Sequence, residues 1–132
     1  MSKRGFLVSA MVVLSVVASS AAAVAPASAD SCIDGHFCLY FNSNGDGAFT
    51  RASGNIPDLA GMTFDACGRS CKGLGQPVKN NAASARNTND WFMAKVFYHS
   101  NYKGAFDFID TNTLRNLENT KNENASVLFW DR

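Results

Sequence analysis

A ten-residue segment of the chain occurs twice. Residues 40–49 read YFNSNGDGAF and residues 97–106 read FYHSNYKGAF, so five of the ten positions are identical at an offset of 57. A second pair follows in the same order, with NNAAS at 80–84 and NENAS at 122–126, at an offset of 42. Two matches in one order indicate an internal duplication, so the fold must be built from two similar units.

Each copy has the pattern of a β-hairpin. Aromatic residues flank a turn rich in Asn and Gly, two residues that tolerate positive φ. In GAFDFID (104–110), Phe106 and Phe108 fall on one face and Asp107 on the other, the period of two that a half-buried strand requires. The repeated segments therefore predict antiparallel strand pairs.

The remaining segments also favour β-structure. ASVLFW (125–130) is β-branched and aromatic and predicts a closing strand. Within 111–119 we expect one short helical turn, because Leu114 and Leu117 are three residues apart. With turn clusters between them, about eight short strands are expected, arranged as two antiparallel sheets.

The first 29 residues have the composition of a secretory signal peptide. Two basic residues precede an uncharged apolar run at 5–17, and the triplet ASA at 27–29 resembles a cleavage site. The run is shorter than the roughly 20 residues that a membrane-spanning helix needs. The expected product is a secreted, extracellular domain of residues 30–132.

The charge of the exported part excludes two classes of partner. The chain has 12 basic and 11 acidic residues, and loss of the two leader cations leaves a net charge near −1. Nucleic-acid-binding domains need a basic stripe, and attraction to anionic lipid needs a cluster of cations. We therefore expect no nucleic-acid or membrane partner, and we expect a monomer.

All four cysteines lie in the exported part: Cys32, Cys38, Cys67 and Cys71. An even number in a short secreted chain indicates two disulfides, for which three connectivities exist. The close spacing favours Cys32–Cys38 and Cys67–Cys71. A four-cysteine zinc site is disfavoured, because the spacings differ from the usual C-x2-C pairs and the compartment is oxidising.

These motifs resemble a known fold. The segment at 97–104 is similar to the aromatic hairpin of βγ-crystallin Greek keys, and the first copy differs by having Gly45 in place of the second ring. C-x5-C-L-Y near the mature start and an N-x-A-S loop in each half resemble the bacterial metalloproteinase-inhibitor family, which has a βγ-crystallin-like fold. The resemblance implies an all-β, two-sheet Greek-key sandwich. Greek key one would span about 31–88 with an insertion at 56–79, and Greek key two about 91–132.

The same resemblance implies a secreted peptidase inhibitor, without catalysis of its own, that blocks a metallopeptidase by non-covalent occlusion. An inhibitory loop gains affinity when a crosslink has already removed its freedom. The second cysteine pair encloses such a loop, with the candidate contact residues Gly68, Arg69 and Ser70. In the family this pair lies after the first ASAR-like segment, whereas here it precedes ASAR at 83–86, so no reactive site is carried over.

The Asn-rich loops also resemble the calcium motif of some crystallins. The candidate calcium ligands are Asn81, Ser84, Glu123 and Ser126. Calcium takes six to eight oxygen ligands that include carboxylates, and only one is present here. The alternative is that these side chains bond the local backbone. No cofactor is required, and a calcium- or cell-wall-polysaccharide-binding, toxin-like module is the alternative function.

The sequence contains no set of catalytic residues. His36 and His99 lie in predicted turns, where we expect them to be exposed. Asp107 and Asp110 are three residues apart on a strand and so face opposite sides of the sheet. An enzyme is therefore not expected.

Overall fold

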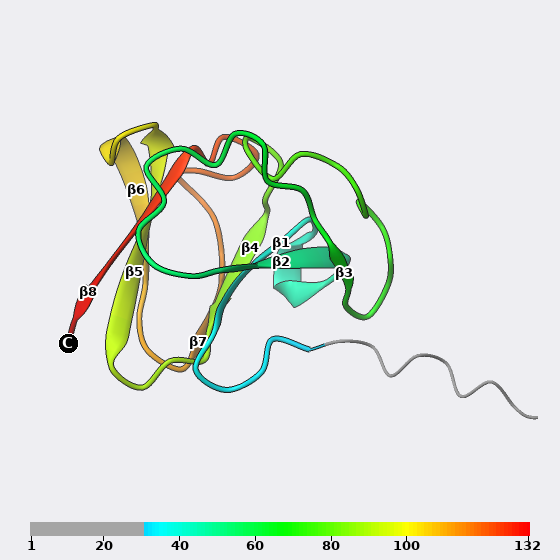
Figure 1. Ribbon diagram of the computed structural model, residues 1–132, viewed down its shortest axis with the longest axis horizontal. Coiled ribbons are helices and arrows are strands. Elements are labelled where there is room, and N and C mark those ends of the chain that lie inside the picture. The colour runs from blue at the N-terminus through cyan, green and yellow to red at the C-terminus, as the bar shows by residue number, and fades with distance from the viewer. Residues whose placement is uncertain (1–30) are drawn as a thin grey trace, which may run out of the picture.

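The computed structural model describes residues 31–132, and Figure 1 shows two sheets packed against each other. The expected signal peptide, residues 1–29, and the expected mature start at residue 30 lie outside the described residues. Within 31–132, no helix is long and apolar enough to cross a membrane.

The described chain forms eight strands and one 3-10 turn in two antiparallel sheets. In chain order these are β1 (Phe37–Tyr40), η1 (Ser43–Gly45), β2 (Ala48–Ala52), β3 (Ala66–Cys67), β4 (Ser84–Asn87), β5 (Phe92–His99), β6 (Lys103–Ile109), β7 (Thr113–Asn116) and β8 (Ser126–Asp131). One sheet has the strand order β3-β2-β1-β4-β7 and the other β6-β5-β8. The two-sheet, all-β architecture expected from the sequence is thereby confirmed.

Each half of the chain contributes one segment to the sheet of the other half. β7, from the second half, pairs with β4 of the first. In return, the N–H of Ile56 donates to the carbonyl of Val127 on β8 (2.9 Å), and the N–H of Val127 donates back to Ile56 (3.0 Å). Neither Greek key can complete its own sheet, so the two halves fold as one unit.

The main core lies between the two sheets. It combines Phe37 and Leu39 of β1 with Val96 of β5, Ile109 of β6 and Val127 of β8, all at most 2% exposed. These inward residues alternate with outward ones, as the period of a strand dictates. A smaller buried cluster, on the outer face of the first sheet, contains Cys32, Cys38, Tyr40 and Phe49.

A buried serine ties together the first hairpin. The hydroxyl of Ser84 on β4 donates to the carbonyl of Asn42 (2.6 Å) and accepts from the N–H of Gly45 (2.9 Å). It therefore satisfies two backbone groups of the β1–β2 turn, one of them the buried N–H of Gly45. Ser84 itself is fully buried.

Ser126 on β8 does the same for the β5–β6 turn. Its hydroxyl donates to the carbonyl of His99 (2.7 Å) and accepts from the N–H of Tyr102 (3.1 Å). The hairpin partners of the two serines are separated by the offset of 57, and the serines themselves by the offset of 42. The two repeated segments in each half are thus in direct contact, which explains why both recur.

The aromatic residues of the repeat also occupy equivalent places. Tyr40 packs on Phe49 with ring centroids 5.3 Å apart, and Phe97 packs on Phe106 at 5.6 Å. Gly104, after the second turn, has φ +85°, and a Cβ there would lie 2.6 Å from His99 Cδ2. Glycine is therefore required at this position by both conformation and space.

The extra segment of the first half is not the simple insertion that the sequence predicts at 56–79. Ile56 pairs with Val127 of β8, and the N–H of Leu59 donates to the carbonyl of Ala125 just before β8 (2.8 Å), so the start of this segment belongs to the sandwich. Phe64 within it is fully buried in the main core and packs edge-on against Phe41 at 5.7 Å. Leu59 and Val78, near its two ends, are also fully buried. The segment is therefore part of the core.

The short helical turn expected within 111–119 is wrong. Residues Thr113–Asn116 form β7, which pairs with β4 through a four-residue register. Leu114 is 39% exposed and Leu117 is 2% exposed, because residues three apart on extended chain face opposite sides. The edge of the first sheet provides backbone hydrogen bonds that outweigh the weak helical spacing.

The disulfides join Cys32 to Cys38 and Cys67 to Cys71, the local pairing that the spacing favours. The first attaches the segment before β1 to β1 itself, within the smaller buried cluster. The second closes a five-residue ring that starts on β3. No cysteine of the described chain is free.

Replacing either bridging serine by alanine should destabilise the protein by about 1–3 kcal/mol, since each change removes two hydrogen bonds of a fully buried hydroxyl group. Ser84→Ala and Ser126→Ala should have similar effects, because their hydrogen bonds are equivalent. Urea unfolding monitored by near-ultraviolet circular dichroism measures the loss. Ser70→Ala, at an exposed position, is the control, and equal stabilities of all three variants would contradict the assignment.

Phe64→Ala should cost about 3–5 kcal/mol, because it creates a cavity in the main core. Leu74→Ala, in the same segment but with Leu74 48% exposed, should change the free energy of unfolding by less than about 0.5 kcal/mol. A small loss for Phe64→Ala in the same urea experiment would show that the insertion is not part of the core.

Candidate functional site

The ring closed by Cys67 and Cys71 is held against β2 at both ends. Cys67 pairs with Ala48 in the β2–β3 ladder. The N–H of Ala48 also donates to the carbonyl of Lys72, just after the ring, at 2.8 Å. The ring is thus fixed by a disulfide and by backbone hydrogen bonds on either side, so little conformational freedom remains to be lost on binding.

The three candidate contact residues differ in exposure. Gly68 is half-buried, and a Cβ there would lie 2.7 Å from the carbonyl oxygen of Gly47, so only glycine permits this close approach. Arg69 and Ser70 are exposed. The ring therefore exposes the guanidinium of Arg69 and the hydroxyl of Ser70 on a rigid backbone. Gly68 allows the ring to pack closely against the backbone of Gly47.

Two hollows occupy equivalent places beside the hairpin turns. The Glu123 hollow has a volume of about 410 Å³ and the Asn81 hollow about 430 Å³. The Glu123 hollow is lined by Lys79, Asn80, Tyr98, His99, Ser100, Asn122, Glu123 and Ala125. The Asn81 hollow is lined by Phe41, Asn42, Ser43, Asn81, Ala83, Lys121 and Asn122.

The four candidate calcium ligands are not brought together. Glu123 lines one hollow and Asn81 the other, and Ser84 and Ser126 are fully buried with their hydroxyls committed to the hairpins. The described chain contains no group of three or more His, Cys, Asp and Glu side chains that could hold a metal.

A lysine in each hollow further opposes a cation. Lys79 and Lys121 are related by the offset of 42, so each half supplies one ammonium group. Lys79 Nζ lies 2.9 Å from Asp58 and 3.2 Å from the Ser100 hydroxyl. The hydrogen bond from Lys79 holds the pKa of Asp58 below its usual value. The donor set of these hollows does not fit calcium, which needs several carboxylate or carbonyl ligands.

Calcium should consequently leave the melting temperature unchanged. The hollows offer one carboxylate and two ammonium groups, so calcium gains too few ligands to offset the repulsion. Differential scanning fluorimetry with calcium chloride, with magnesium chloride at equal ionic strength and with a chelator measures this. A rise in melting temperature that is specific to calcium and reversed by the chelator would contradict it.

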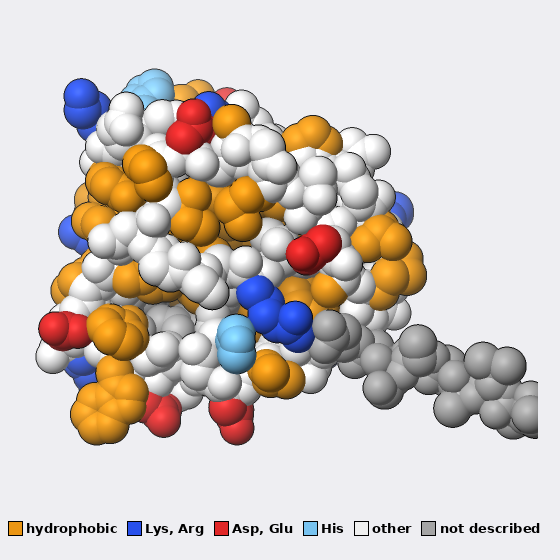
Figure 2. All heavy atoms as spheres, viewed as in Figure 1, with side chains coloured by type: hydrophobic (Ala, Val, Ile, Leu, Met, Phe, Trp, Pro, Cys, Tyr) orange, Lys and Arg blue, Asp and Glu red, His pale blue; other side chains and the backbone are white. Residues whose placement is uncertain are grey.

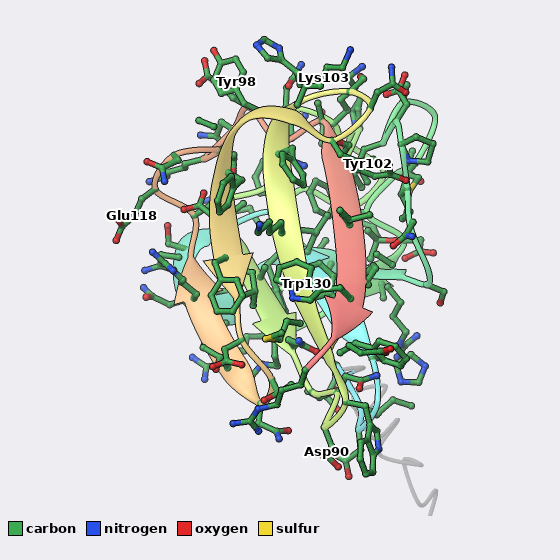
Figure 3. The ribbon with its side chains drawn as sticks, turned by 90° about the vertical axis from the view of Figure 1, so that its left-hand side faces the viewer. Asp90, Tyr98, Tyr102, Lys103, Glu118 and Trp130 are labelled. Carbon is green, nitrogen blue, oxygen red and sulfur yellow. A yellow bond between two sulfur atoms is a disulfide. The ribbon has the colours of Figure 1, made fainter. Side chains whose placement is uncertain are left out.

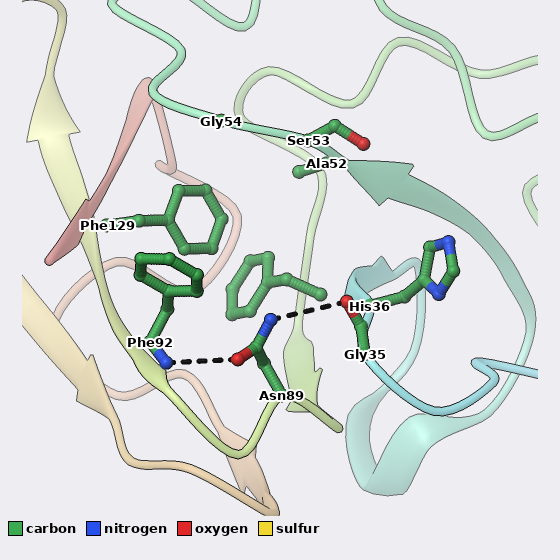
Figure 4. A pocket seen from close by; sticks show the side chains of 9 residues that line it. Gly35, His36, Ala52, Ser53, Gly54, Asn89, Phe92 and Phe129 are labelled. Atoms are coloured by element: carbon green, nitrogen blue, oxygen red, sulfur yellow. Dashed lines mark hydrogen bonds between the residues drawn. The ribbon is translucent and has the colours of Figure 1, made fainter. Parts of the chain in front are cut away.

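The turn between the two Greek keys presents an exposed tryptophan that sequence reasoning missed. Trp91 is 75% exposed. Its backbone N–H and that of Phe92 both donate to Asn89 Oδ1, at 2.8 and 3.0 Å, which locks the turn. Asn89 Nδ2 also donates to the carbonyl of Gly35 (Figure 4).

A pocket of about 270 Å³ lies beside this turn, at the end of the sandwich. Its apolar wall consists of Phe37, Phe92 and Phe129, and His36 and Ser53 line its polar side (Figure 4). No periodicity in the sequence signals it, because the phenylalanines come from three strands that meet only in the folded chain.

The outer face of the second sheet is aromatic. Lys95 Nζ on β5 lies 4.5 Å from the centroid of Phe106 and 4.9 Å from that of Trp130, and Phe108 packs on Trp130 at 5.7 Å. Figure 3 shows Trp130 in the middle of this face. The alternation of β6 predicts that Phe106 and Phe108 share a face, but not that this face points outward while Asp107 is buried. The convergence of three strands on Lys95 depends on register.

The titratable side chains form no catalytic pair. His36 is half-buried rather than exposed, and His99 is exposed; each lines a different cavity. Asp107 is 1% exposed, and its carboxylate accepts hydrogen bonds from the N–H groups of Glu118, Asn119 and Thr120. The Asp107 carboxylate therefore holds the 118–120 loop in place through backbone hydrogen bonds.

On the face in Figure 2, acidic and basic side chains lie scattered among hydrophobic and neutral ones.

Comparison with known proteins gives one match to a sequence family and several to solved structures. The model of "Peptidase inhibitor family I36" matches residues 25–109, which is more than half of the chain. None of the curated proteins compared with the chain matches it.

The solved structures that resemble the chain are βγ-crystallin-type domains. One, reported under "Evolution of the eye lens beta-gamma-crystallin domain fold", has a TM-score of 0.57 and 13% identity, covering 78% of this chain and 92% of that one. The N-terminal domain of Protein S has a TM-score of 0.53 and 14% identity, covering 73% and 96%. A βγ-crystallin domain from Flavobacterium johnsoniae has a TM-score of 0.52 and 17% identity, covering 73% and 94%. Such identities show the fold alone.

Proposed function

Because the chain belongs to peptidase inhibitor family I36, we propose that it blocks a metallo-type peptidase by non-covalent occlusion. Membership of this family identifies the protein as a peptidase inhibitor and not an enzyme. The two disulfides are in keeping with an extracellular protein, and we propose that it is secreted. The metallo-type target rests on the resemblance of the cysteine and Asn-rich motifs described above.

The Cys67–Cys71 ring is the proposed contact element. The observation that supports it is the double anchoring of the ring to Ala48, together with the exposure of Arg69 and Ser70. A loop that is already ordered loses little entropy when it enters a cleft, so more of its contact energy appears as affinity. Arginine is also among the residues that most often dominate the binding energy of interfaces.

The proposal predicts stoichiometric inhibition of at least one metallopeptidase, and none of serine or cysteine peptidases, in a panel assay with the purified protein. Arg69→Ala should weaken inhibition by roughly tenfold to a hundredfold, as expected for loss of a central interface arginine. Lys103→Gln, a charge removal on the β5–β6 hairpin, is the matched control. The inhibitor should remain intact after the incubation.

Two outcomes would revise this proposal. Inhibition restricted to serine or cysteine peptidases would contradict the metallo-type target while leaving inhibition itself in place. Full potency of Arg69→Ala would move the contact away from the ring, and the rigid turn that displays Trp91 would then be the next element to test.

A second candidate function is binding to a cell-wall polysaccharide, which the aromatic outer face of the second sheet favours. The exposed ring of Phe106 and the half-buried ring of Trp130 present large rigid surfaces on which sugar rings can stack. A polysaccharide-binding module would be retained on insoluble chitin or wall material and would leave all peptidases active. Loss of retention in Trp130→Ala, with Trp91→Ala as control, would assign binding to this face.

A further inference from the structure

A small pocket of about 180 Å³ lies directly beside the Cys67–Cys71 ring, on the outer face of the first sheet. Gly68 and Arg69 of the ring line it together with Gly45 and Arg86. The described residues that line it are Ser31, Cys32, Tyr40, Gly45, Gly68, Arg69 and Arg86. None of these side chains is acidic.

The internal duplication shows why the pocket exists. In the second half, Tyr102 packs its ring on Phe97 at 6.2 Å, above the hairpin turn. The equivalent of Tyr102 in the first half is Gly45, and a Cβ at Gly45 would lie 3.2 Å from Leu114 Cδ1 and 3.7 Å from Arg86 Nη2. Because the second ring of the motif is missing, the side chains of Leu114 and Arg86 lie beside the hairpin turn in the first half.

The residue that projects into this space also differs between the halves. Arg86 on β4 pairs with Cys38, and its equivalent on β8, Leu128, pairs with Lys95 in the same register. The first half therefore has an arginine where the second half has an apolar residue. Compared with the second half, the first half has Gly45 in place of the Tyr102 ring and Arg86 in place of Leu128. These two differences give the first half a pocket lined by a positive charge.

Arg86 is incompletely satisfied in this pocket. Its Nε is buried and has no hydrogen-bond partner among the described residues. Neither Arg86 nor Arg69 forms an ion pair within residues 31–132. Burying a guanidinium N–H without a partner is costly, and an anion bound at the terminal nitrogens would offset the uncompensated positive charge.

Tyr40 forms the base of the pocket and stays neutral. Burial raises the pKa of its phenol, although the nearby positive charge of Arg86 and a hydrogen bond from the Arg86 guanidinium act in the opposite direction. A neutral phenol can donate a hydrogen bond and adds no negative charge that would compete with an anionic ligand.

We propose that this pocket is a carboxylate-binding site. A carboxylate can accept hydrogen bonds from the terminal nitrogens of a guanidinium, here those of Arg86, and such pairs are short and charge-assisted. Arg69 supplies a second positive charge from the ring. The carboxylate comes either from a free small molecule or from an acidic side chain of the peptidase. Only the second source rests on the proposed function.

The site can be tested on the isolated protein with acetate as the probe. Titration with sodium acetate, compared with sodium chloride at equal ionic strength, is followed by the Nε–H resonance of Arg86 in proton–nitrogen spectra. Acetate should shift this resonance in a saturable manner. No acetate-specific shift up to about 0.1 M, where exposed charges are already well screened, would overturn the proposal.

Three variants separate the site from general charge effects. Arg69→Gln should weaken acetate binding at least threefold without affecting the fold, since Arg69 is exposed. Arg86→Lys keeps the positive charge but removes the planar guanidinium, so it should weaken acetate binding at least tenfold. Because this variant lacks the Arg86 Nε–H resonance, its binding is measured from the backbone amide resonances around the pocket. Lys103→Gln should bind as the parent does. Equal binding by all three variants would also overturn the proposal.

Inhibition assays then identify the source of the carboxylate. Weaker inhibition in acetate than in chloride at equal ionic strength would assign the ligand to an acidic side chain of the peptidase. Equal inhibition, with acetate bound, would assign it to a free carboxylate. If the protein inhibits no peptidase, the proposed function fails, but the acetate titration still decides whether the pocket binds a carboxylate.

Discussion

The architecture depends on two buried hydroxyl groups. Ser84 and Ser126 each lie where a folded hairpin meets the strand that returns beside it, and each bonds a backbone carbonyl and a backbone N–H of the hairpin turn. A serine suits this place because one oxygen both donates and accepts within a small volume. These contacts hold both hairpin turns against the strands beside them, next to the two hollows. They also account for the unsuitability of those hollows for calcium, because the hydroxyl groups face the backbone.

The two halves share this framework and differ in what is placed on it. The second half keeps the ring of Tyr102 over its hairpin and leaves an aromatic outer face on its sheet. The first half has Gly45 at the same place, Arg86 on β4 and the disulfide-closed ring Cys67–Cys71 beside its outer face. Because the second half gives β7 to the first sheet and Ile56 of the first half pairs with β8, the two halves with their different surfaces form one unit. One surface can therefore change in sequence while the opposite half continues to support the fold.

Most of the fold could be predicted from the sequence, because duplication and the period of two are local patterns. Hairpin partners, the ring pairs and the short disulfides all involve residues whose spacing is visible in the chain. The prediction of a helical turn within 111–119 was wrong, because the pairing of β7 with β4 decides the conformation of this segment and joins residues far apart in the chain. The role of Phe64 could not be predicted because nothing in its neighbourhood signals burial. Likewise, the site was only partly predictable: the ring around Arg69 is a local pattern, whereas the pocket beside it is formed by residues from distant segments.

The five-residue ring has a consequence for the stability of a complex against the peptidase itself. If a peptide bond between Cys67 and Cys71 were hydrolysed, the two new chain ends would remain joined through the disulfide. They would also stay attached to the same edge of β2, through Cys67 on one side and Lys72 on the other. The ends would then meet at a high effective concentration, which favours resealing of the bond over release of a cleaved product. A cut that destroys an ordinary substrate would leave this ring in place.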